Sequence, residues 1–371
     1  MVESILPDAL IRIRDKYPAS KCLRDEWEKV RALVKKGKDD EAEAFAKSCI
    51  DSHPNLKVRN KVAVQHRIKR REFLMDQKIL EGKIKEALQK LSSRLERMLL
   101  DNADSDGKVP LSKLNGFIER AKTYNTEAWA EIAILLKAAI RDSVWYGIVV
   151  SMDSAQAGLD MAIKTKETYA QYGDPALEIG IWIISETENK AIINRTSAIF
   201  KTIFDRVQQR RIKQKLFSKR TGIDQTGVPL SRRIWDIRDW HLRRIRGTLS
   251  SGIADGRPAS AIANDLRKMT VIGKISDKAM LEPGQGIYKS AYKNALRVVR
   301  TETNNAYVDA ELEYAKQKGY KKMWNVNVGH RTEDSCDDLA GKIFDPEEIE
   351  ALYPQHPNDA CFMTTVIPGI G

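Results

Sequence analysis

Hydrophobic residues recur every three or four positions through most of the chain, which is the spacing of amphipathic helices. The first clear case is residues 25–37, where Trp27, Val30 and Val34 fall on one side of the predicted helix. Residues 39–53 repeat the pattern and end just before a proline. The two segments together predict a helical hairpin.

Residues 57–100 predict one long helix with a basic surface. Residues 112–125 and 126–152 continue as helices, and the second is apolar almost all round in places, which is typical of a central core helix. Residues 179–184 fit either a short strand or the start of a buried helix. The long basic helix has a single apolar stripe, which we expect to pack against another helix: Ile79, Ile84, Leu88, Leu91, Leu95 and Met98.

Two further amphipathic helices are predicted, over residues 196–217 and 231–256. In the second of them, Trp235 and Trp240 stand among arginines. Aromatic rings interleaved with arginine can stack on nucleic-acid bases. More often such a tryptophan pair anchors a helix in a core, with the arginine stems lying over the rings.

After a long helix over residues 284–319, the pattern changes to short strands and helical turns. The sequence therefore predicts a mainly α fold, with long amphipathic helices in the N-terminal two-thirds and a small C-terminal α+β module. The predicted strands are residues 321–328, 342–344 and 361–368, and the predicted short helical segments are 335–341 and 345–354. We divide the chain into an N-terminal helical region, a central helical basic region and the C-terminal module, at residues 1–111, 112–249 and 250–371.

A chain of 371 residues with 42% hydrophobic residues has room for two or three domains with real cores. No stretch approaches the ~18 apolar residues of a membrane span. The first residues lack the basic start, apolar middle and cleavage site of a signal peptide. We expect a chain that remains in the cytoplasm, makes no membrane contact, and carries its four cysteines as thiols or metal ligands.

The net charge of +12 is distributed unevenly. Residues 206–246 hold thirteen Lys or Arg against three Asp or Glu, whereas residues 331–371 hold two against nine. A basic surface of this density favours a polyanion such as DNA or RNA, although solvated helix faces give the same pattern. The candidate nucleic-acid or partner contacts are Arg210, Arg211, Lys213, Lys215, Arg232, Arg233, Arg243, Arg244 and Arg246.

Residues 101–113 can be aligned with a calcium-binding loop. With Gly107 in the sixth position, Asn102 falls in the first, and Asp104 and Asp106 follow in the third and fifth. The twelfth position, which needs a bidentate glutamate, holds Lys113. We therefore favour a turn rich in Asn and Asp that caps the next helix.

The C-terminal segment carries four landmarks in a fixed order. An Arg-Thr-Glu lies on a helix, a tryptophan on a strand, an Arg-Thr precedes a cysteine and a glycine, and a His-Pro-Asn precedes a second cysteine. These residues are Arg300, Thr301, Glu302, Trp324, Arg331, Thr332, Cys336, Gly341, His356, Pro357, Asn358 and Cys361.

In this order and spacing, residues 250–370 resemble the phage minor head proteins of the Mu F-like family, also called phage head morphogenesis proteins. The resemblance implies structural roles for Arg300, Thr301, Glu302, Trp324, Arg331, Thr332, Gly341, Pro357 and Asn358. The sequence departs from the family pattern at His330, where the family often has Asp, and after Asn358, where the family often has two cysteines and this chain has Asp359 and then Cys361.

The resemblance implies a minor head (capsid) structural protein of a tailed bacteriophage. Such a protein is associated with the portal vertex inside the head and acts in head assembly and in DNA packaging and ejection. The implied partners are the portal protein, the major capsid protein and packaged double-stranded DNA. The implied location is the virion, in the head interior near the portal, after assembly in the host cytoplasm.

Cys336, His356 and Cys361 are a candidate zinc set, with Asp359 or His330 as a fourth ligand. Structural zinc sites usually use close Cys pairs, and none is present here. The alternative is that the two cysteines are buried thiols that lie side by side. We expect no cofactor, and zinc remains the open alternative.

Arg300 and Glu302 also raise the question of an enzyme, because Glu can act as a general base. The two residues are two positions apart on a helix, so their side chains diverge. We expect instead no catalytic step, with Arg300 paired to Asp334 or Asp337 and its loss damaging the module's folding. The alternatives are a nucleic-acid-acting enzyme or toxin, and a zinc-stabilised nucleic-acid-binding module, either one using the same C-terminal fold.

Overall fold

The structure is a computed structural model that describes residues 6–18, 24–164, 230–272, 290–327, 335–355 and 360–367. The predicted elements at residues 179–184 and 196–217 lie outside these ranges. The chain divides into two compact units. Unit 1 holds the described residues within Met1–Leu74, Arg141–Val207 and Asn304–Gly371, and unit 2 holds those within Met75–Ile140 and Gln208–Thr303.

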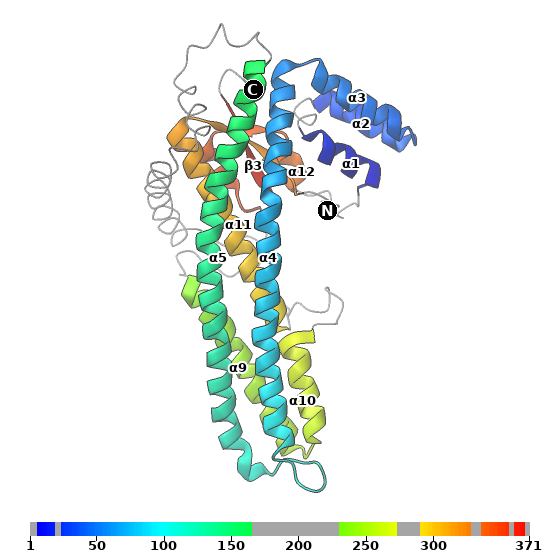
Figure 1. The fold of residues 1–371 in the computed structure, drawn as a ribbon. Helices are drawn as coiled ribbons and strands as arrows, with labels where there is room; N and C mark the ends of the chain where they lie inside the picture. Colours follow the sequence, from blue (N-terminus) through cyan, green and yellow to red (C-terminus); the bar gives the residue numbers. More distant parts are fainter. Residues whose placement is uncertain are drawn as a thin grey trace. The chain divides into compact units, whose positions relative to one another are not determined.

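The predicted fold class is confirmed: long helices dominate, and a small three-stranded antiparallel sheet lies near the C-terminus (Figure 1). Three long helices each contribute residues to both units, and they are α4 (Pro54–Leu100), α5 (Leu114–Lys164) and α11 (Ala291–Lys318). The remaining helices of unit 1 are α1 (Asp8–Lys16), α2 (Arg24–Lys35), α3 (Asp39–Asp51), α12 (Ser335–Leu339) and α13 (Pro346–Leu352). The strands are β1 (Lys321–Asn325), β2 (Ile343–Phe344) and β3 (Phe362–Val366).

Helices α1, α2 and α3 share a small core of their own within unit 1. The predicted stripe of Trp27, Val30 and Val34 is buried in it, as the helical spacing requires. Arg14 of α1 is also buried and donates a hydrogen bond to Asp337 of α12 over 3.1 Å. This ion pair ties the N-terminal helices to the C-terminal module.

Helix α4 confirms the predicted long helix and corrects one member of its apolar stripe. Ile84 and the stripe residues after it are buried, but Ile79 has 56% of its surface exposed. Leu80 is buried instead. The reason is geometric, because Leu80 precedes Ile84 by four positions and so shares its face, whereas Ile79 precedes it by five.

The loop between α4 and α5 forms the predicted turn, but it does not cap the next helix, because the short helical turn η2 (Leu111–Lys113) is preceded by Pro110 and has no side-chain cap. The Asp104 carboxylate accepts backbone N–H groups from Asp106 and Lys108, over 3.0 and 2.8 Å. The ammonium group of Lys113 lies 3.1 Å from the side-chain oxygen of Asn102. The residue in the twelfth position thus contacts the residue in the first, and an internal cation lies where the calcium alignment would require a carboxylate.

Helix α5 is one helix where the sequence analysis treated residues 112–125 and 126–152 separately. It is less central than predicted, since Ile134 and Trp145 are 69% and 42% exposed. Within unit 1 it passes very close to α11 at Gly147. A Cβ atom at that position would lie 2.4 Å from the backbone oxygen of Tyr307, so only glycine allows this approach.

In unit 2, α9 (Leu230–Ala254) and α10 (Ala259–Arg267) pack with parts of α4 and α5, and a short π-helical turn, η4 (Lys268–Ile272), follows α10. His241 of α9 is fully buried. The indole N–H of Trp129 lies 3.3 Å from its Nδ1, and the Thr270 hydroxyl lies 3.2 Å from its Nε2. The Thr270 hydroxyl in turn donates to the backbone oxygen of Leu266 over 2.7 Å.

No helix in the described part of the chain is long and apolar enough to cross a membrane.

Candidate functional site in the C-terminal module

The sheet of the C-terminal module is covered on both faces by helices of unit 1. Its strand order is β2-β1-β3, all antiparallel, with Trp324 paired to Met363 and Met323 to Thr364. Directly paired residues share a face of a sheet. Trp324 and Met363 pack in one apolar cluster with residues of α11 and α5, and Met323 packs with Ala63 of α4. Every residue of β3 is buried, which two-sided coverage explains.

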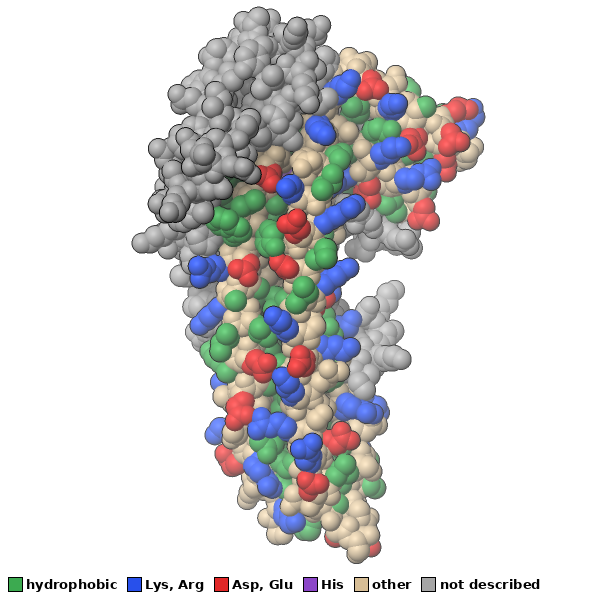
Figure 2. Space-filling model, viewed as in Figure 1, with side chains coloured by type: hydrophobic (Ala, Val, Ile, Leu, Met, Phe, Trp, Pro, Cys, Tyr) green, Lys and Arg blue, Asp and Glu red, His purple; other side chains and the backbone are tan. Residues whose placement is uncertain are grey.

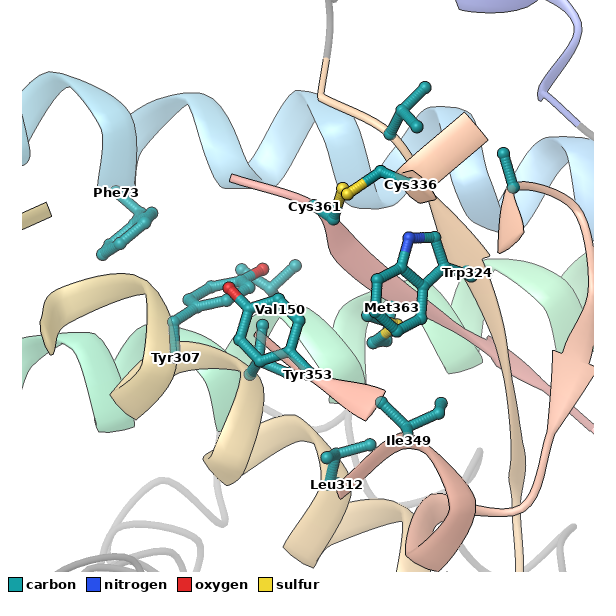
Figure 3. Packing of buried hydrophobic residues seen from close by; sticks show 13 residues of the cluster. Phe73, Val150, Tyr307, Leu312, Trp324, Cys336, Ile349, Tyr353, Cys361 and Met363 are labelled. Carbon is teal, nitrogen blue, oxygen red and sulfur yellow. The ribbon is translucent and has the colours of Figure 1, made fainter. Parts of the chain in front are cut away.

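Two residues of the family motif stand at the centre of this arrangement. Trp324 is fully buried and packs near Tyr353, Ile349 and Met363 (Figure 3). Gly341 has φ of 82°, in the left-handed region that glycine adopts without strain. Its N–H donates to the backbone oxygen of Trp324 over 2.8 Å, so the glycine locks the end of α12 onto β1.

A cluster of buried polar groups joins α4 to α11 beside the sheet. His66 Nε2 lies 3.0 Å from Glu311 Oε1 and 2.9 Å from the Tyr307 hydroxyl, and all three side chains are fully buried. The Tyr307 hydroxyl can donate or accept, so its role toward Nε2 depends on which ring nitrogen of His66 carries the proton. Burial lowers the pKa of His66, and the neighbouring Glu311 opposes that shift. Burial likewise raises the pKa of Tyr307.

Arg70 of α4 is buried and reaches three parts of the module. Its guanidinium donates to the side chain of Asn327 over 3.2 Å and to the backbone oxygen of Ala360 over 3.0 Å. It also lies over the rings of Phe362 and Tyr307, at 4.9 and 5.5 Å from the centroids. Arg70 therefore fixes the approach to β3 relative to α4.

Lys322 of β1 is fully buried as well. Its ammonium group lies 3.2 Å from the hydroxyl of Ser151 on α5 and 3.2 Å from that of Thr365 on β3. Burial lowers the pKa of Lys322 to about 8, while Glu311 acts in the opposite direction. Hydroxyl partners and a nearby carboxylate are what make a buried cation tolerable.

The Arg-Thr-Glu landmark lies on α11 within unit 2. Of the two predicted partners of Arg300, Asp337 pairs with Arg14, and Asp334 lies outside the described residues. Arg300 pairs with Glu81 of α4 through two hydrogen bonds, of 2.6 and 2.9 Å. The Arg300 side chain is 43% exposed, so this charge is only half-buried. A long α4 places Glu81 opposite α11, and no local pattern around Arg300 signals that partner.

Thr301 and Glu302 follow on the buried side of α11, with 2% and 1% of their surfaces exposed. The divergence predicted for Arg300 and Glu302 is therefore present, since one side chain is half exposed and the other is enclosed. The structural role assigned to these positions remains a prediction.

Cys336 and Cys361 are both buried in the module's apolar cluster as thiols. No group of three or more His, Cys, Asp and Glu side chains with metal-binding geometry occurs among the described residues. The other candidate zinc ligands, His356, Asp359 and His330, lie outside the described ranges, so the zinc alternative is untested. Four residues of the family motif also lie outside the described ranges: Arg331, Thr332, Pro357 and Asn358.

Of the nine predicted basic contacts, three have described side chains, all on α9. Arg243 is exposed, whereas Arg244 and Arg246 are partly covered. Trp240 is buried and the Arg244 guanidinium lies 5.4 Å from its ring centroid, which matches the packing interpretation of this tryptophan. The side chains of Arg232 and Arg233, and the residues Arg210, Arg211, Lys213 and Lys215, lie outside the description.

Elsewhere in unit 2, basic residues are matched by nearby acids. Arg94 of α4 pairs with Glu127 of α5 over 2.6 Å, and Lys90 pairs with Glu86 over 3.1 Å. On the coloured part of the face in Figure 2, blue and red side chains alternate along α4 and α5. The solvated-face interpretation therefore fits this part of the basic sequence.

Four buried residues of this site, His66, Arg70, Glu311 and Lys322, were not predicted from the sequence. One local signal existed, because His66 and Arg70 are four positions apart on α4 and Tyr307 and Glu311 four apart on α11, so each pair shares a helix face. On a basic helix such as α4, His66 and Arg70 cannot be distinguished by sequence from the solvent-exposed charged residues around them. Lys322 follows the exposed Lys321, and nothing in the sequence distinguishes the buried lysine from the exposed one.

These observations define a class of protein: a small α+β module built onto long helices, with the motif residue Trp324 in its core. Residues 243–365, about a third of the chain, match the family model described as Phage Mu protein F like protein. The match takes in α11 and all three strands, and it confirms for this segment the resemblance drawn from the sequence. No curated protein and no solved structure gives a significant match to the chain.

Proposed function

We infer that the chain is a minor head protein of a tailed bacteriophage, which acts by binding other head components during head assembly. The observation that carries this proposal is the match of residues 243–365 to the Mu F-like family model. The match coincides with the module in which Trp324 and Gly341 are structural.

The finer assignment is the portal vertex inside the head, with roles in DNA packaging and ejection. The long helices of both units support it, because they offer extended surfaces for a portal or capsid protein. The acidic end of the chain supports it too, since nine acids against two bases in residues 331–371 favour a basic partner surface.

The test is co-purification of the tagged full chain with the portal protein of the same genome. It is run at low salt and at about 0.5 M salt, where exposed charge contacts are screened, with nuclease present and metal content measured. We expect a stoichiometric complex that survives nuclease. Recovery of nucleic acid without portal protein would overturn the portal assignment and favour a nucleic-acid-binding module.

Contact with packaged DNA is a separate part of the proposal, and Arg243 is its best described candidate because its side chain is exposed on α9. Arg243→Glu should weaken binding to duplex DNA and reduce the dependence of affinity on salt. The matched control is Lys137→Glu, which makes the same charge change at an exposed position of α5 in the same unit. Equal losses in both variants would indicate a general charge effect and no site at Arg243.

A further inference from the structure

The core of the C-terminal module contains two thiols that come from different elements. Cys336 is the second residue of α12, and Cys361 immediately precedes β3. They are 0% and 3% exposed. In Figure 3 their sulfur atoms point toward one another, and both residues belong to one apolar cluster.

The surroundings of the pair are apolar and closely packed. Trp324, Tyr353 and Met363 belong to the same cluster, and Figure 3 shows the nitrogen edge of the Trp324 indole turned toward the two sulfur atoms. Thiols in such surroundings are inert while the structure is closed, because the reactive thiolate is disfavoured. A reagent therefore reaches them through local opening of the module.

We propose that Cys336 and Cys361 are a redox pair that closes into an intramolecular disulfide when the chain meets a small-molecule disulfide such as oxidised glutathione. One protein thiolate attacks the reagent, forms a mixed disulfide and releases one glutathione thiolate. The second protein thiolate then attacks the protein sulfur of the mixed disulfide and releases the second glutathione. Two protein thiols are oxidised, and one glutathione disulfide is reduced to two glutathione molecules.

The fold favours this closure over reaction with two separate glutathione molecules. Both cysteines are held in a packed core, so the second thiol is already close when the first has reacted. The position of α12 is fixed by Asp337, which pairs with buried Arg14, and by Gly341, which bonds to Trp324. The bond would tie α12 to β3 and close a loop that contains β2 and α13.

Cys49 provides an internal control. It is 8% exposed on α3, is also a thiol, and does not belong to the apolar cluster of Cys336 and Cys361. Burial raises the pKa of the Cys49 thiol. A reagent that modified any buried thiol would also modify Cys49. A disulfide-forming pair should instead react at Cys336 and Cys361 while Cys49 remains a thiol.

The inference rests on the module's core and not on the proposed head function, so its test uses the purified full chain alone. The chain is equilibrated with graded ratios of oxidised to reduced glutathione, quenched in acid, alkylated, digested and mapped by mass spectrometry. We expect one crosslink, between the peptides of Cys336 and Cys361, that reaches completion at ratios where Cys49 is still alkylated. Stable glutathione adducts on the two cysteines, or crosslinks to Cys22 or Cys49, would overturn the proposal.

A second measurement detects the consequence of the bond. The oxidised chain should unfold at a higher urea concentration than the reduced chain, and reductant should abolish the difference. Cys49→Ser should keep this shift, and Cys336→Ser should lose it. Because the mapping uses the unaltered chain, the proposal remains testable even if Cys336→Ser fails to fold.

Metal content is measured on the same samples. Stoichiometric zinc that blocks the crosslink until a chelator is added would assign the two thiols to a metal site, and would overturn the redox proposal. A crosslink that forms at the same glutathione ratios with and without chelator would support it.

Discussion

The hydrogen bonds around His241 fix its protonation state. The Trp129 indole can only donate, so Nδ1 of His241 accepts, and Nε2 carries the proton that faces Thr270. The ring is therefore neutral in the folded chain. Burial lowers the pKa of His241 to about 3, and the nearby Arg244 acts in the same direction.

This pKa predicts acid sensitivity of unit 2. In the unfolded chain a histidine has a pKa of about 6.5, so the unfolded state binds one proton more than the folded state between that pH and about 3. The free energy of unfolding should thus be unaffected above pH 6.5, and should fall below it by up to about 1.4 kcal/mol per pH unit. Urea unfolding between about pH 7 and pH 4.5 measures the slope.

The variant His241→Gln tests the assignment, because an amide can accept from Trp129 and donate to Thr270 but does not titrate. It should flatten the acid slope relative to the unaltered chain. A slope that His241→Gln does not change would show that the acid sensitivity comes from other groups, with His66 the next candidate because burial lowers its pKa too.

Arg300 gives a second prediction for a single side chain. Its pairing with Glu81 is bidentate, but the two side chains are 43% and 17% exposed. Exposed ion pairs contribute little, so Arg300→Ala should lower the free energy of unfolding by only about 1 kcal/mol. A double-mutant cycle with Glu81→Ala measures the coupling between the two residues. Loss of folding in Arg300→Ala would contradict this small effect and favour the structural role that the sequence predicts for Arg300.

For the helices and strands, the sequence was a good guide to where elements lie and a poor one to how they meet. Helical spacing identified α2, α4 and α11, and alternation with turn residues identified β1 and β3. Helical spacing assigned Ile79 wrongly to the buried side of α4, because the position of a neighbouring helix decides which side of a basic helix is covered. The pairing of Arg300 with Glu81 and of His66 with Glu311 depends on contacts between elements far apart in sequence. The spacing of hydrophobic residues along the chain does not predict such contacts.

The crossing of α5 and α11 depends on Gly147. Adding a methyl group there brings it 2.4 Å from a backbone oxygen, and neither helix can move without disturbing its neighbours. Gly147→Ala should therefore cost about 2 kcal/mol or more, as overpacking does. The matched control is Gly82→Ala in the middle of α4, where nothing lies within 4 Å.

The control variant Gly82→Ala should change the free energy of unfolding in the direction opposite to Gly147→Ala. Alanine is favoured over glycine inside helices by about 0.5–1 kcal/mol, so Gly82→Ala should raise the free energy of unfolding. Denaturant unfolding of both variants under the same conditions gives the comparison. Equal effects in the two variants would mean that α5 and α11 do not approach closely at Gly147.

At the scale of the whole molecule, the segment that matches the Mu F-like family model does not contain all of its own core. Residues 54–74 of α4 supply His66, Arg70 and Phe73, and α5 supplies Val150 and Ser151. The sequence division at residue 250 assigned these helices to other regions. Composition and spacing gave no means to see that distant helices complete the sheet.

We therefore predict that residues 243–371 expressed alone do not fold cooperatively. Without α4 and α5, the sheet face with Met323 loses Ala63, and the cluster around Trp324 loses Phe73 and Val150 and keeps only α11 as a long covering helix, which leaves too little buried apolar surface. Urea unfolding and near-ultraviolet circular dichroism should show no cooperative transition. Adding residues 1–164 as a separate chain should restore one, and a cooperative transition of the isolated segment would refute the prediction.

The loop between α4 and α5 has a consequence for how the chain responds to divalent ions. Lys113 holds its ammonium group beside Asn102, in a loop that otherwise resembles a calcium-binding loop. The positive charge that closes the turn is covalently part of the chain, so dilution cannot release it and a chelator cannot extract it. A turn built this way keeps its shape whether the surroundings are rich or poor in divalent ions.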